Sequence, residues 1–299
     1  MEFKLACVCC HYNFANYGNN RKNLIEFLNN MQQHNVPIYG VELVLPNQEA
    51  VTMGNPNWRQ ITIDTNLHIM WQKETLLNLA EKLIPEEYNA IAWIDADIVF
   101  ENKLWVQDTC NSLKTYDVVQ LFEYCNWLNI DGDISLKGRT IVSLNNDITS
   151  NMVTRTVKYH TGFAWAMKRS LWQNIGGLYN RCVKGGADLV MAHYFLQPTT
   201  NLNNEHKLYI THDVSTLPEI FLEWARNLGT VSVGNIAGTV LHNWHGTRGN
   251  RQHTKRKLIP INIETDIEVD SNKILRWSEY SLSSLRRAVR AYFYDRREG

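Results

Sequence analysis

The sequence predicts an α/β protein with a mostly parallel central sheet and flanking helices, and two observations carry this prediction. Short apolar runs typical of strands alternate with segments whose apolar residues recur at helical spacing. In addition, residues 90–100 form a near-continuous apolar run, which is typical of a central strand covered on both faces. Such alternation favours parallel strands joined by right-handed crossovers.

Each element of this pattern has its own signal in the residues. The expected strands are short apolar runs that end in turn residues, and they cover residues 3–10, 37–45, 60–63, 90–100, 118–122, 161–167 and 231–241. The expected helices cover residues 23–31, 71–83 and 187–196. Residues 129–156 are polar and rich in Asn, Asp, Ser and Thr. A loop of this length is usually functional, so a lid over the substrate is one option for this segment.

The chain of 299 residues is long enough for one large α/β domain with a modest appendage. Neither a repeat nor a linker rich in Gly, Ser or Pro interrupts it, so we expect one domain over residues 1–257 and a C-terminal extension over residues 258–299. The 30 Lys and Arg residues balance the 30 Asp and Glu residues, which excludes a global field that would gather polyanions. From residue 240 onward, however, basic residues outnumber acidic ones, which favours an anion site or a membrane-facing or nucleic-acid-facing surface there.

The extension contains a basic amphipathic stretch over residues 283–297. Such a helix can lie on an anionic membrane, contact nucleic-acid phosphates, or pack on the domain with its charged face outward. No apolar run approaches the roughly 20 residues that span a bilayer, and the N-terminus has no apolar signal region. We therefore expect a cytoplasmic protein, with peripheral membrane contact through the basic helix as one option.

The first cluster of chemically active residues is the pair Asp95 and Asp97, at the end of the apolar run over residues 90–100. Because successive strand side chains alternate, we expect both carboxylates on one face, at the carboxyl end of a strand where open α/β sheets place their ligands. A divalent cation would remove their mutual repulsion. The simpler alternative is a pair of loop carboxylates that cap the next helix.

The second cluster follows the strand predicted over residues 231–241. His242 and His245 stand three residues apart, a spacing at which both imidazoles reach one metal if the backbone turns. Imidazoles beside carboxylates favour Mn²⁺ over a purely oxygen-ligated Mg²⁺ site, and Arg248 and Arg251 are suited to bind a diphosphate. The alternative is a surface histidine pair among solvated basic residues, and the joint presence of histidines, a Trp and a basic run favours a site over this alternative.

Two weaker clusters complete the set. Gly185 and Gly186 allow the backbone to approach a ligand closely, and Asp188 follows them at the start of a predicted helix. Residue types alone do not decide between two roles for this carboxylate: it is either a general base that takes a hydroxyl proton or an ordinary helix cap. Lys73 and Asn78 are either donor contacts or the solvated face of a helix.

In this order, the four clusters resemble the GT-A class of nucleotide-sugar glycosyltransferases, over about residues 4–257. The resemblance implies a single GT-A domain, Rossmann-like with a mostly parallel central sheet and flanking helices, followed by the C-terminal helical extension. In that class an Asp-x-Asp at a strand end holds Mn²⁺ or Mg²⁺ against the donor diphosphate, and Asp95 and Asp97 match it. The resemblance further implies that Asp97 is a direct metal ligand and that His245 or His242 completes the metal shell.

More narrowly, the pattern is similar to the β-1,4-galactosyltransferase type and to uncharacterised bacterial and viral glycosyltransferases. The stretch from Lys73 to Asn78 resembles its basic residue before Leu-x-Asn, and Gly185-Gly186-Ala187-Asp188 resembles its Gly-Gly-Glu-Asp, whose Asp is the catalytic base. Ala187 and Leu189 replace two acids of that family, which leaves the acceptor open. The residues expected at the donor are Lys73, Asn78, Asp95, Arg248, Arg251, His11 and Asn13, and those expected on the acceptor side are Gly185, Gly186, Trp165 and Trp244.

The resemblance thus implies a metal-dependent, inverting glycosyltransferase with Asp188 as the base. It would move a hexose-type sugar from a nucleoside diphosphate sugar, with UDP-sugars favoured, to a hydroxyl of a glycan, a lipid-linked glycan or a modified nucleic-acid base. One alternative is a nucleotidyltransferase, but that class carries an early Gly-rich phosphate loop, whereas residues 11–16 here read His-Tyr-Asn-Phe-Ala-Asn. The other alternative is a carbohydrate-binding module, which would not need acids, histidines and arginines together.

Overall fold

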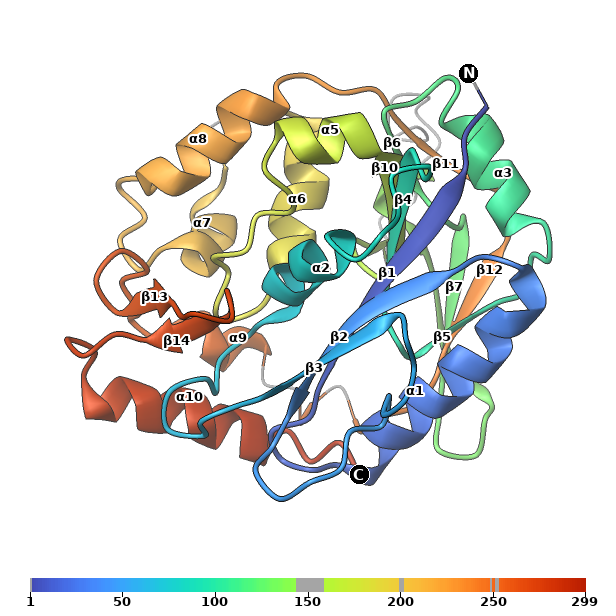
Figure 1. Cartoon of the computed structure of the whole chain (residues 1–299). Helices are drawn as coiled ribbons and strands as arrows, with labels where there is room; N and C mark the ends of the chain where they lie inside the picture. Colours follow the sequence, from blue (N-terminus) through green and yellow to red (C-terminus); the bar gives the residue numbers. More distant parts are fainter. Residues whose placement is uncertain (1, 144–158, 199–201, 248, 251–252) are drawn as a thin grey trace.

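The computed structural model of the chain describes residues 2–143, 159–198, 202–247, 249–250 and 253–299 (Figure 1). A seven-stranded sheet forms its centre, and within the described residues β10 runs antiparallel to both of its neighbours while the other strand pairs are parallel. The prediction of a mostly parallel central sheet is therefore confirmed. The strands follow one another across the sheet in the order β11 (Val233–Asn235), β6 (Val118–Gln120), β10 (Ala164–Lys168), β4 (Ala90–Ile94), β1 (Leu5–Tyr12), β2 (Ile38–Val44) and β3 (Trp58–Thr62).

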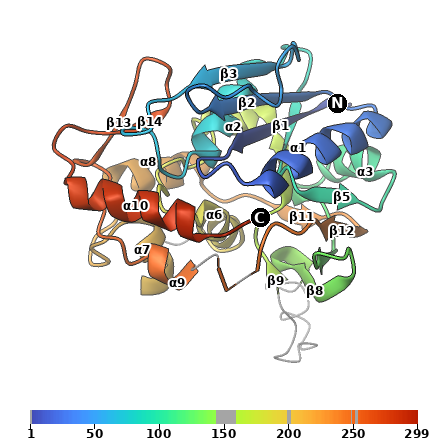
Figure 2. The same cartoon turned by 90° about the horizontal axis from the view of Figure 1, so that it is seen from below.

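Helices cover both faces of this sheet, and the alternation of side chains along β1 shows how (Figures 1 and 2). Ala6 and Val8 point into one hydrophobic core, and Cys7 and Cys9 point into the other. The helices that pack on the Cys7 side are α1 (Gly18–Met31) and α3 (Trp105–Ser112). Those that pack on the Val8 side are α2 (Lys73–Glu81), α5 (Arg169–Asn174), α6 (Ala187–Leu196), α7 (Asn204–Ile210) and α8 (Glu219–Leu228). Short helical turns are η1 (Gln32–His34) and α9 (His253–Arg256).

A second, five-stranded sheet corrects two of the strand predictions. The apolar run over residues 90–100 is two strands in different sheets. The N–H of Asp95 makes the last bond to the central sheet, to the carbonyl of Phe163 (2.8 Å), and the chain forms its next strand at Ile98 in the second sheet. The run over residues 231–241 is divided in the same way. The order of the second sheet is β5 (Ile98–Phe100), β12 (Thr239–His242), β7 (Tyr124–Leu128), β8 (Ile134–Thr140) and β9 (Tyr159–His160).

Part of the segment that the sequence marks as a loop is therefore regular structure. Within residues 129–156, β8 pairs antiparallel with β7, so its polar side chains belong to a half-exposed strand. Residues 144–158 lie outside the described part of the chain, and the lid stays a prediction.

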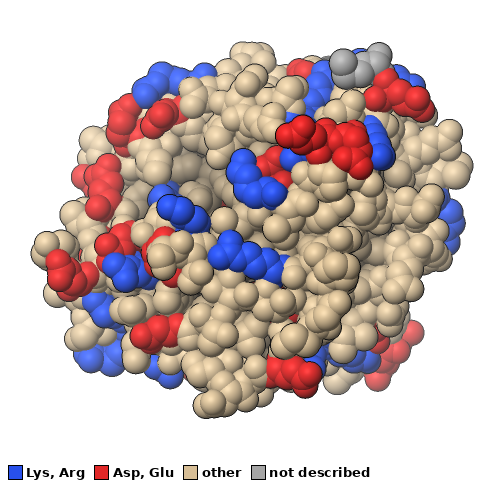
Figure 3. Space-filling model, in the orientation of Figure 1, with Lys and Arg blue, Asp and Glu red and all other residues tan. Residues whose placement is uncertain are grey.

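The C-terminal extension shares the core of the main body. It forms the hairpin of β13 (Ile267–Val269) and β14 (Leu275–Trp277), followed by α10 (Ser283–Asp295). On α10, Val289, Tyr292 and Phe293 are buried in the same core as α2 and α6, so the apolar side of this helix packs on the protein. Figure 3 shows basic and acidic side chains interspersed over one face of the molecule. None of the described helices is both long and apolar enough to cross a bilayer, and membrane or nucleic-acid contact by α10 stays a prediction.

Glu42, on β2, is a buried carboxylate that anchors the edge of the central sheet. It accepts hydrogen bonds from the Thr52 hydroxyl (2.6 Å), from the backbone N–H groups of Val51 and Thr52 (2.9 and 2.8 Å) and from Nδ1 of His11 (3.2 Å). Burial alone would raise the pKa of Glu42, but these hydrogen bonds lower it from 4.5 to about 2. The stabilisation is therefore fully present above pH 4.5 and is lost as the pH falls toward 2.

We expect Glu42→Gln to lower the free energy of unfolding at pH 7 by about 2 to 3 kcal/mol, since the amide cannot accept all four bonds as a carboxylate does. The difference from wild type should shrink steadily as the pH falls from 4.5 toward 2. Urea unfolding across this range measures both effects, and the exposed Glu49→Gln serves as control. A difference that stays constant across the acid range would contradict the assignment.

Candidate active site

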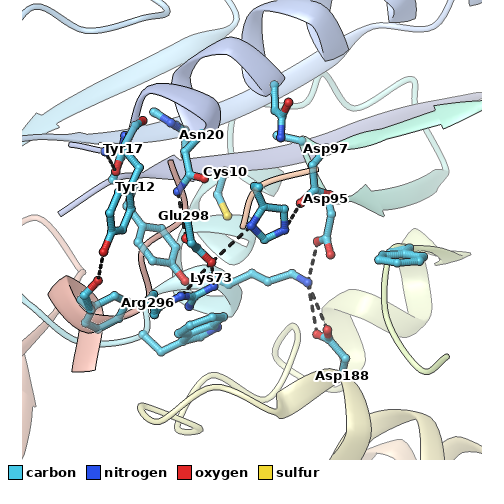
Figure 4. A pocket seen from close by; sticks show the side chains of 18 of the residues that line it. Cys10, Tyr12, Tyr17, Asn20, Lys73, Asp95, Asp97, Asp188, Arg296 and Glu298 are labelled. Carbon is cyan, nitrogen blue, oxygen red and sulfur yellow. Dashed lines mark hydrogen bonds and ion pairs between the residues drawn. The ribbon is translucent and has the colours of Figure 1, made fainter. Parts of the chain in front are cut away.

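A cavity of about 410 Å³ opens where β1 and β4 end, at the carboxyl ends of central parallel strands (Figure 4). In α/β sheets this is the usual position of a ligand site. The side chains around it come from many separate stretches of the chain. These are the end of β1 with the following loop and α1, the start of α2, the β4–β5 connection, residues 160–163, the start of α6, one residue of α7, the end of β12, and several residues between 256 and 298. Charged side chains from so many elements converging on one cavity are typical of a binding or active site.

Three potential metal ligands converge on one side of the cavity. Oδ2 of Asp97 lies 3.1 Å from Nε2 of His245 and 3.5 Å from Nε2 of His242, and the two Nε2 atoms are 3.3 Å apart. The second sheet brings them together, because His242 pairs with Ile98 in the antiparallel β12–β5 ladder and the N–H of Asn243 donates to the carbonyl of Asp97 (2.7 Å). One carboxylate and two imidazoles form a donor set that suits Mn²⁺ and related divalent ions.

A fourth group, Glu298, orients His245 through the ring nitrogen that does not face Asp97. Its Oε1 lies 3.2 Å from Nδ1 of His245 and 2.8 Å from Nε of Arg296, and Asn20 donates to its Oε2 (3.3 Å). Burial would raise the pKa of Glu298, but the hydrogen bond from His245 and the charge of Arg296 lower it to about 2. Because a carboxylate only accepts hydrogen bonds, Nδ1 of His245 donates to Glu298, and Nε2 is the ring atom that lies toward Asp97.

The loop after β1 and the start of α1 hold the segment that carries Glu298. The Tyr17 hydroxyl donates to the carbonyls of Phe293 (3.0 Å) and Tyr294 (2.7 Å), and Asn19 donates to the carbonyl of Glu298 (3.1 Å). The sequence gives a basic, amphipathic signal here but no link between Glu298 and His245, which stands 53 positions earlier. Arg296 and Glu298 are therefore site residues that sequence reasoning missed.

The second charged group of the cavity is a lysine between two carboxylates, which Figure 4 shows. Nζ of Lys73 lies 2.6 Å from Oδ1 of Asp95 and 3.2 Å from Oδ1 of Asp188. Burial opposes the charge of Lys73, but the two carboxylates raise its pKa well above its usual value. Burial also raises the pKa of Asp95 to about 6 despite the nearby lysine. The two acids of the Asp-x-Asp pair thus have different neighbours: Asp97 faces the histidines, and Asp95 faces Lys73.

Asp188 stands in the first turn of α6, and a glycine leaves room for its carboxylate. A Cβ atom built on Gly162 would lie 2.5 Å from Oδ2 of Asp188, which no real Cβ contact allows. Gly186, at the N-cap of α6, has φ +89°, and a Cβ there would lie 2.4 Å from the Tyr209 ring. Two glycines therefore let Asp188 face the cavity, and one of them, Gly162, carried no signal in the sequence.

The cavity takes in most of the predicted site residues, and they are His11, Asn13, Lys73, Asp95, Asp97, Gly186, Asp188, His242 and His245. Two of them already use much of their hydrogen-bonding capacity. Asn13 brackets the backbone of Tyr17 through both amide atoms (2.7 and 2.8 Å), and Nδ1 of His11 is bound to Glu42. Nε2 of His11 has no hydrogen-bond partner among the residues that the structure describes.

The other predicted residues do not line the cavity or cannot be placed. Asn78 holds the backbone of Leu178 through its carbonyl and amide groups (2.8 and 2.9 Å), so the structure gives it a packing role in place of a donor contact. Trp165 is buried and stacks on Trp93 at 6.3 Å between ring centroids, which makes it a core residue. Gly185 and Trp244 lie just outside the lining, and Arg248 and Arg251 fall outside the described residues.

The sequence matches no protein-family model and no curated protein. Solved structures similar to the chain include glucosyl-3-phosphoglycerate synthase from Mycobacterium tuberculosis in complex with Mn²⁺, UDP and phosphoglyceric acid, at 9% identity and a TM-score of 0.40 over 94% of this chain and 88% of that one. The catalytic domain of Drosophila β-1,4-galactosyltransferase 7 is 11% identical, with a TM-score of 0.36 over 65% and 61%. A 4-diphosphocytidyl-2C-methyl-D-erythritol synthase from Anaerococcus prevotii is 13% identical, with a TM-score of 0.37 over 79% and 89%. Likenesses this distant assign neither a family nor a reaction.

We expect Glu298→Gln to weaken Mn²⁺ binding by about 10- to 100-fold, because the variant loses the charge that fixes the tautomer of His245. Calorimetric titration of Mn²⁺ into the protein without nucleotide measures this directly. The exposed Glu279→Gln, on the same C-terminal segment, should bind Mn²⁺ as the wild type does. Equal affinity in the Glu298 and Glu279 variants would remove Glu298 from the metal site.

We expect Gly162→Ala to turn the side chain of Asp188 out of its position while leaving the fold intact, because the new methyl group takes the place of Oδ2. If Asp188 takes part in the reaction, turnover should fall at least tenfold with Mn²⁺ affinity unchanged. The control is Gly18→Ala, where a Cβ would make one ordinary contact, at 3.9 Å. Undiminished turnover would show that this position of Asp188 is not required.

Proposed function

We propose that the protein is a divalent-metal-dependent glycosyltransferase that moves a sugar from a nucleoside diphosphate sugar to a hydroxyl acceptor. The observation that carries the proposal is the pairing, in one cavity, of the Asp97-His242-His245 trio with a separate carboxylate, Asp188, at a helix start. A metal trio alone would also suit a structural ion. A second carboxylate facing the same space supplies the proton acceptor that a transfer to a hydroxyl needs.

Asp97, His242 and His245 are the residues that would hold the ion, and Mn²⁺ is favoured over Mg²⁺ by the two imidazoles. When bound there, a divalent cation supplies neutralisation of the negative charge that grows on a departing diphosphate. Within the protein, Glu298 accepts the hydrogen bond of Nδ1 and so directs Nε2 of His245 toward the metal position, and Arg296 helps to lower the pKa of Glu298. These two residues thus act on the reaction through the orientation of one ligand.

Asp188 is the proposed base. It would accept the proton of the acceptor hydroxyl as that oxygen attacks the anomeric carbon from the face opposite the leaving diphosphate, and one such displacement inverts the anomeric configuration. Lys73, whose Nζ lies 3.2 Å from Oδ1 of Asp188, holds the carboxylate toward the cavity. The aromatic rings of Tyr12, Trp71 and Phe293 line the same cavity and offer flat apolar surfaces for a base or sugar ring. UDP-sugars are the favoured donors, and Arg248 and Arg251 are proposed diphosphate contacts.

The test is release of nucleotide from a panel of nucleoside diphosphate sugars, with and without Mn²⁺, by wild type, Asp97→Asn and Asp188→Asn. We expect Mn²⁺-dependent release of the nucleoside diphosphate from one donor by the wild type. Asp97→Asn should abolish it, and Asp188→Asn should retain nucleotide binding but lose transfer by about 10²- to 10⁴-fold. The exposed Asp133→Asn is the control, and NMR of the product reads the anomeric configuration.

Each departure from this pattern has a defined meaning. Pyrophosphate released from a nucleoside triphosphate and a sugar phosphate would replace the proposal with nucleotidyl transfer. Sugar binding without metal and without nucleotide release would support a carbohydrate-binding module. Full turnover by Asp188→Asn would remove Asp188 as the base, and a product with retained configuration would contradict a single displacement.

A further inference from the structure

Arg256 is a buried cation on the wall of the cavity that has no acidic partner among the described residues. Its exposed fraction is 6%, and it lines the same cavity as Asp188. Among the described residues, its guanidinium makes one hydrogen bond, from Nη1 to the Tyr292 hydroxyl (3.1 Å). Nε of Arg256 is buried and has no hydrogen-bond partner in the part of the chain that the structure describes.

The surroundings of Arg256 are aromatic. Its guanidinium carbon lies 5.0 Å from the ring centroid of Trp71 and 5.9 Å from those of Tyr209 and Tyr292. Cation–π attraction offsets part of the cost of burying the charge, but it does not replace a counter-anion. Arg296 gives the contrast within the same site: it lies 5.1 Å from the Trp71 ring, and it is also paired with Glu298. Arg256 is thus a cation with hydrogen-bonding capacity left for a ligand.

The position of Arg256 relates it to the proposed base. A Cβ on Gly185 would lie 2.8 Å from Nη1 of Arg256, so the guanidinium packs directly against the glycine loop that precedes Asp188. The ring of Tyr209, which Arg256 faces, also lies against Gly186 at the start of α6. The metal trio comes from the β4–β5 connection and the end of β12, which are other elements.

We propose that Arg256 binds an oxyanion carried by the acceptor, a phosphate or a carboxylate, while the reacting hydroxyl of that acceptor lies at Asp188. This inference rests on the proposed function and narrows it to anionic acceptors. A guanidinium suits the role because its planar donors bind two oxygens of a phosphate or carboxylate at once. The aromatic wall keeps water away from the pair and strengthens it.

The competing occupant of Arg256 is the diphosphate of the donor, and the experiment must separate the two. Methyl phosphate is titrated calorimetrically into the protein saturated with Mg²⁺ and UDP, and separately into the protein alone. Acetate is titrated in the same two ways. The variants are Arg256→Gln, which removes the charge, and Arg256→Lys, which keeps the charge but loses the planar fork. Arg290→Gln is the matched control, since Arg290 is exposed and stacks on Tyr294 at 5.7 Å.

We expect methyl phosphate or acetate to bind the wild type with UDP in place. The dissociation constant for the anion should rise at least tenfold in Arg256→Gln and severalfold in Arg256→Lys, and it should not change in Arg290→Gln. The affinity for UDP with Mg²⁺ should be the same in all four proteins. Melting curves show that each variant is folded, and Arg256→Lys decides the outcome if Arg256→Gln does not fold.

Three results would overturn the inference: no binding of either anion, displacement of the anion by UDP, or a loss of UDP affinity in Arg256→Gln as large as the loss of anion affinity. The last two would assign Arg256 to the donor. Failure of the wild type to bind UDP with Mg²⁺ or Mn²⁺ would instead count against the proposed function. The anion titration of the protein alone would still decide whether Arg256 forms an anion site.

Discussion

The arrangement of this site depends on the need to compensate several partly or fully buried carboxylates that face one cavity. Burial of a carboxylate without a compensating partner is costly, so each acid is matched to a group from a different part of the chain. Asp95 and Asp188 share Lys73, and Glu298 is matched by His245 and Arg296. Asp97 faces imidazoles that add no charge in their neutral form, which is the electrostatic setting that favours a bound cation.

Much of the fold can be predicted from local patterns in the sequence, namely short apolar runs and apolar residues at helical spacing. The strand and helix signals before residue 90 are correct in type and close in extent, and the helix over residues 187–196 is predicted to the residue. Two predicted strands are divided by the structure, and both divisions have one cause. In residues 90–100 and 231–241, an apolar run continues through a point at which the chain passes from one sheet to the other, and apolarity does not record which sheet a residue joins.

The site is predictable where its residues are neighbours in the chain and unpredictable where they are not. The pair Asp95 and Asp97 and the pair His242 and His245 are each found from local spacing and chemistry, and the structure brings Asp97 together with the histidines. Glu298 belongs to the same cluster, but nothing in the sequence connects it with a histidine so far from it along the chain. Asn78 shows the opposite error, since a plausible local pattern places it at the donor while its amide group holds a neighbouring backbone segment.

Tyr17 and Asn19 form hydrogen bonds with the backbone of the segment that carries Glu298. Under the proposed function, the packing of this segment is therefore linked to the affinity for metal. An ion bound as proposed would contact His245 and so favour the docked segment. By the same linkage, local detachment of that segment, without global unfolding, would weaken binding of the ion. The apparent metal affinity therefore contains the free energy of a docking equilibrium some distance from the ion. At low concentrations of divalent metal, the fraction of sites that hold an ion would therefore depend on how stably the segment around Glu298 is bound to Tyr17 and Asn19.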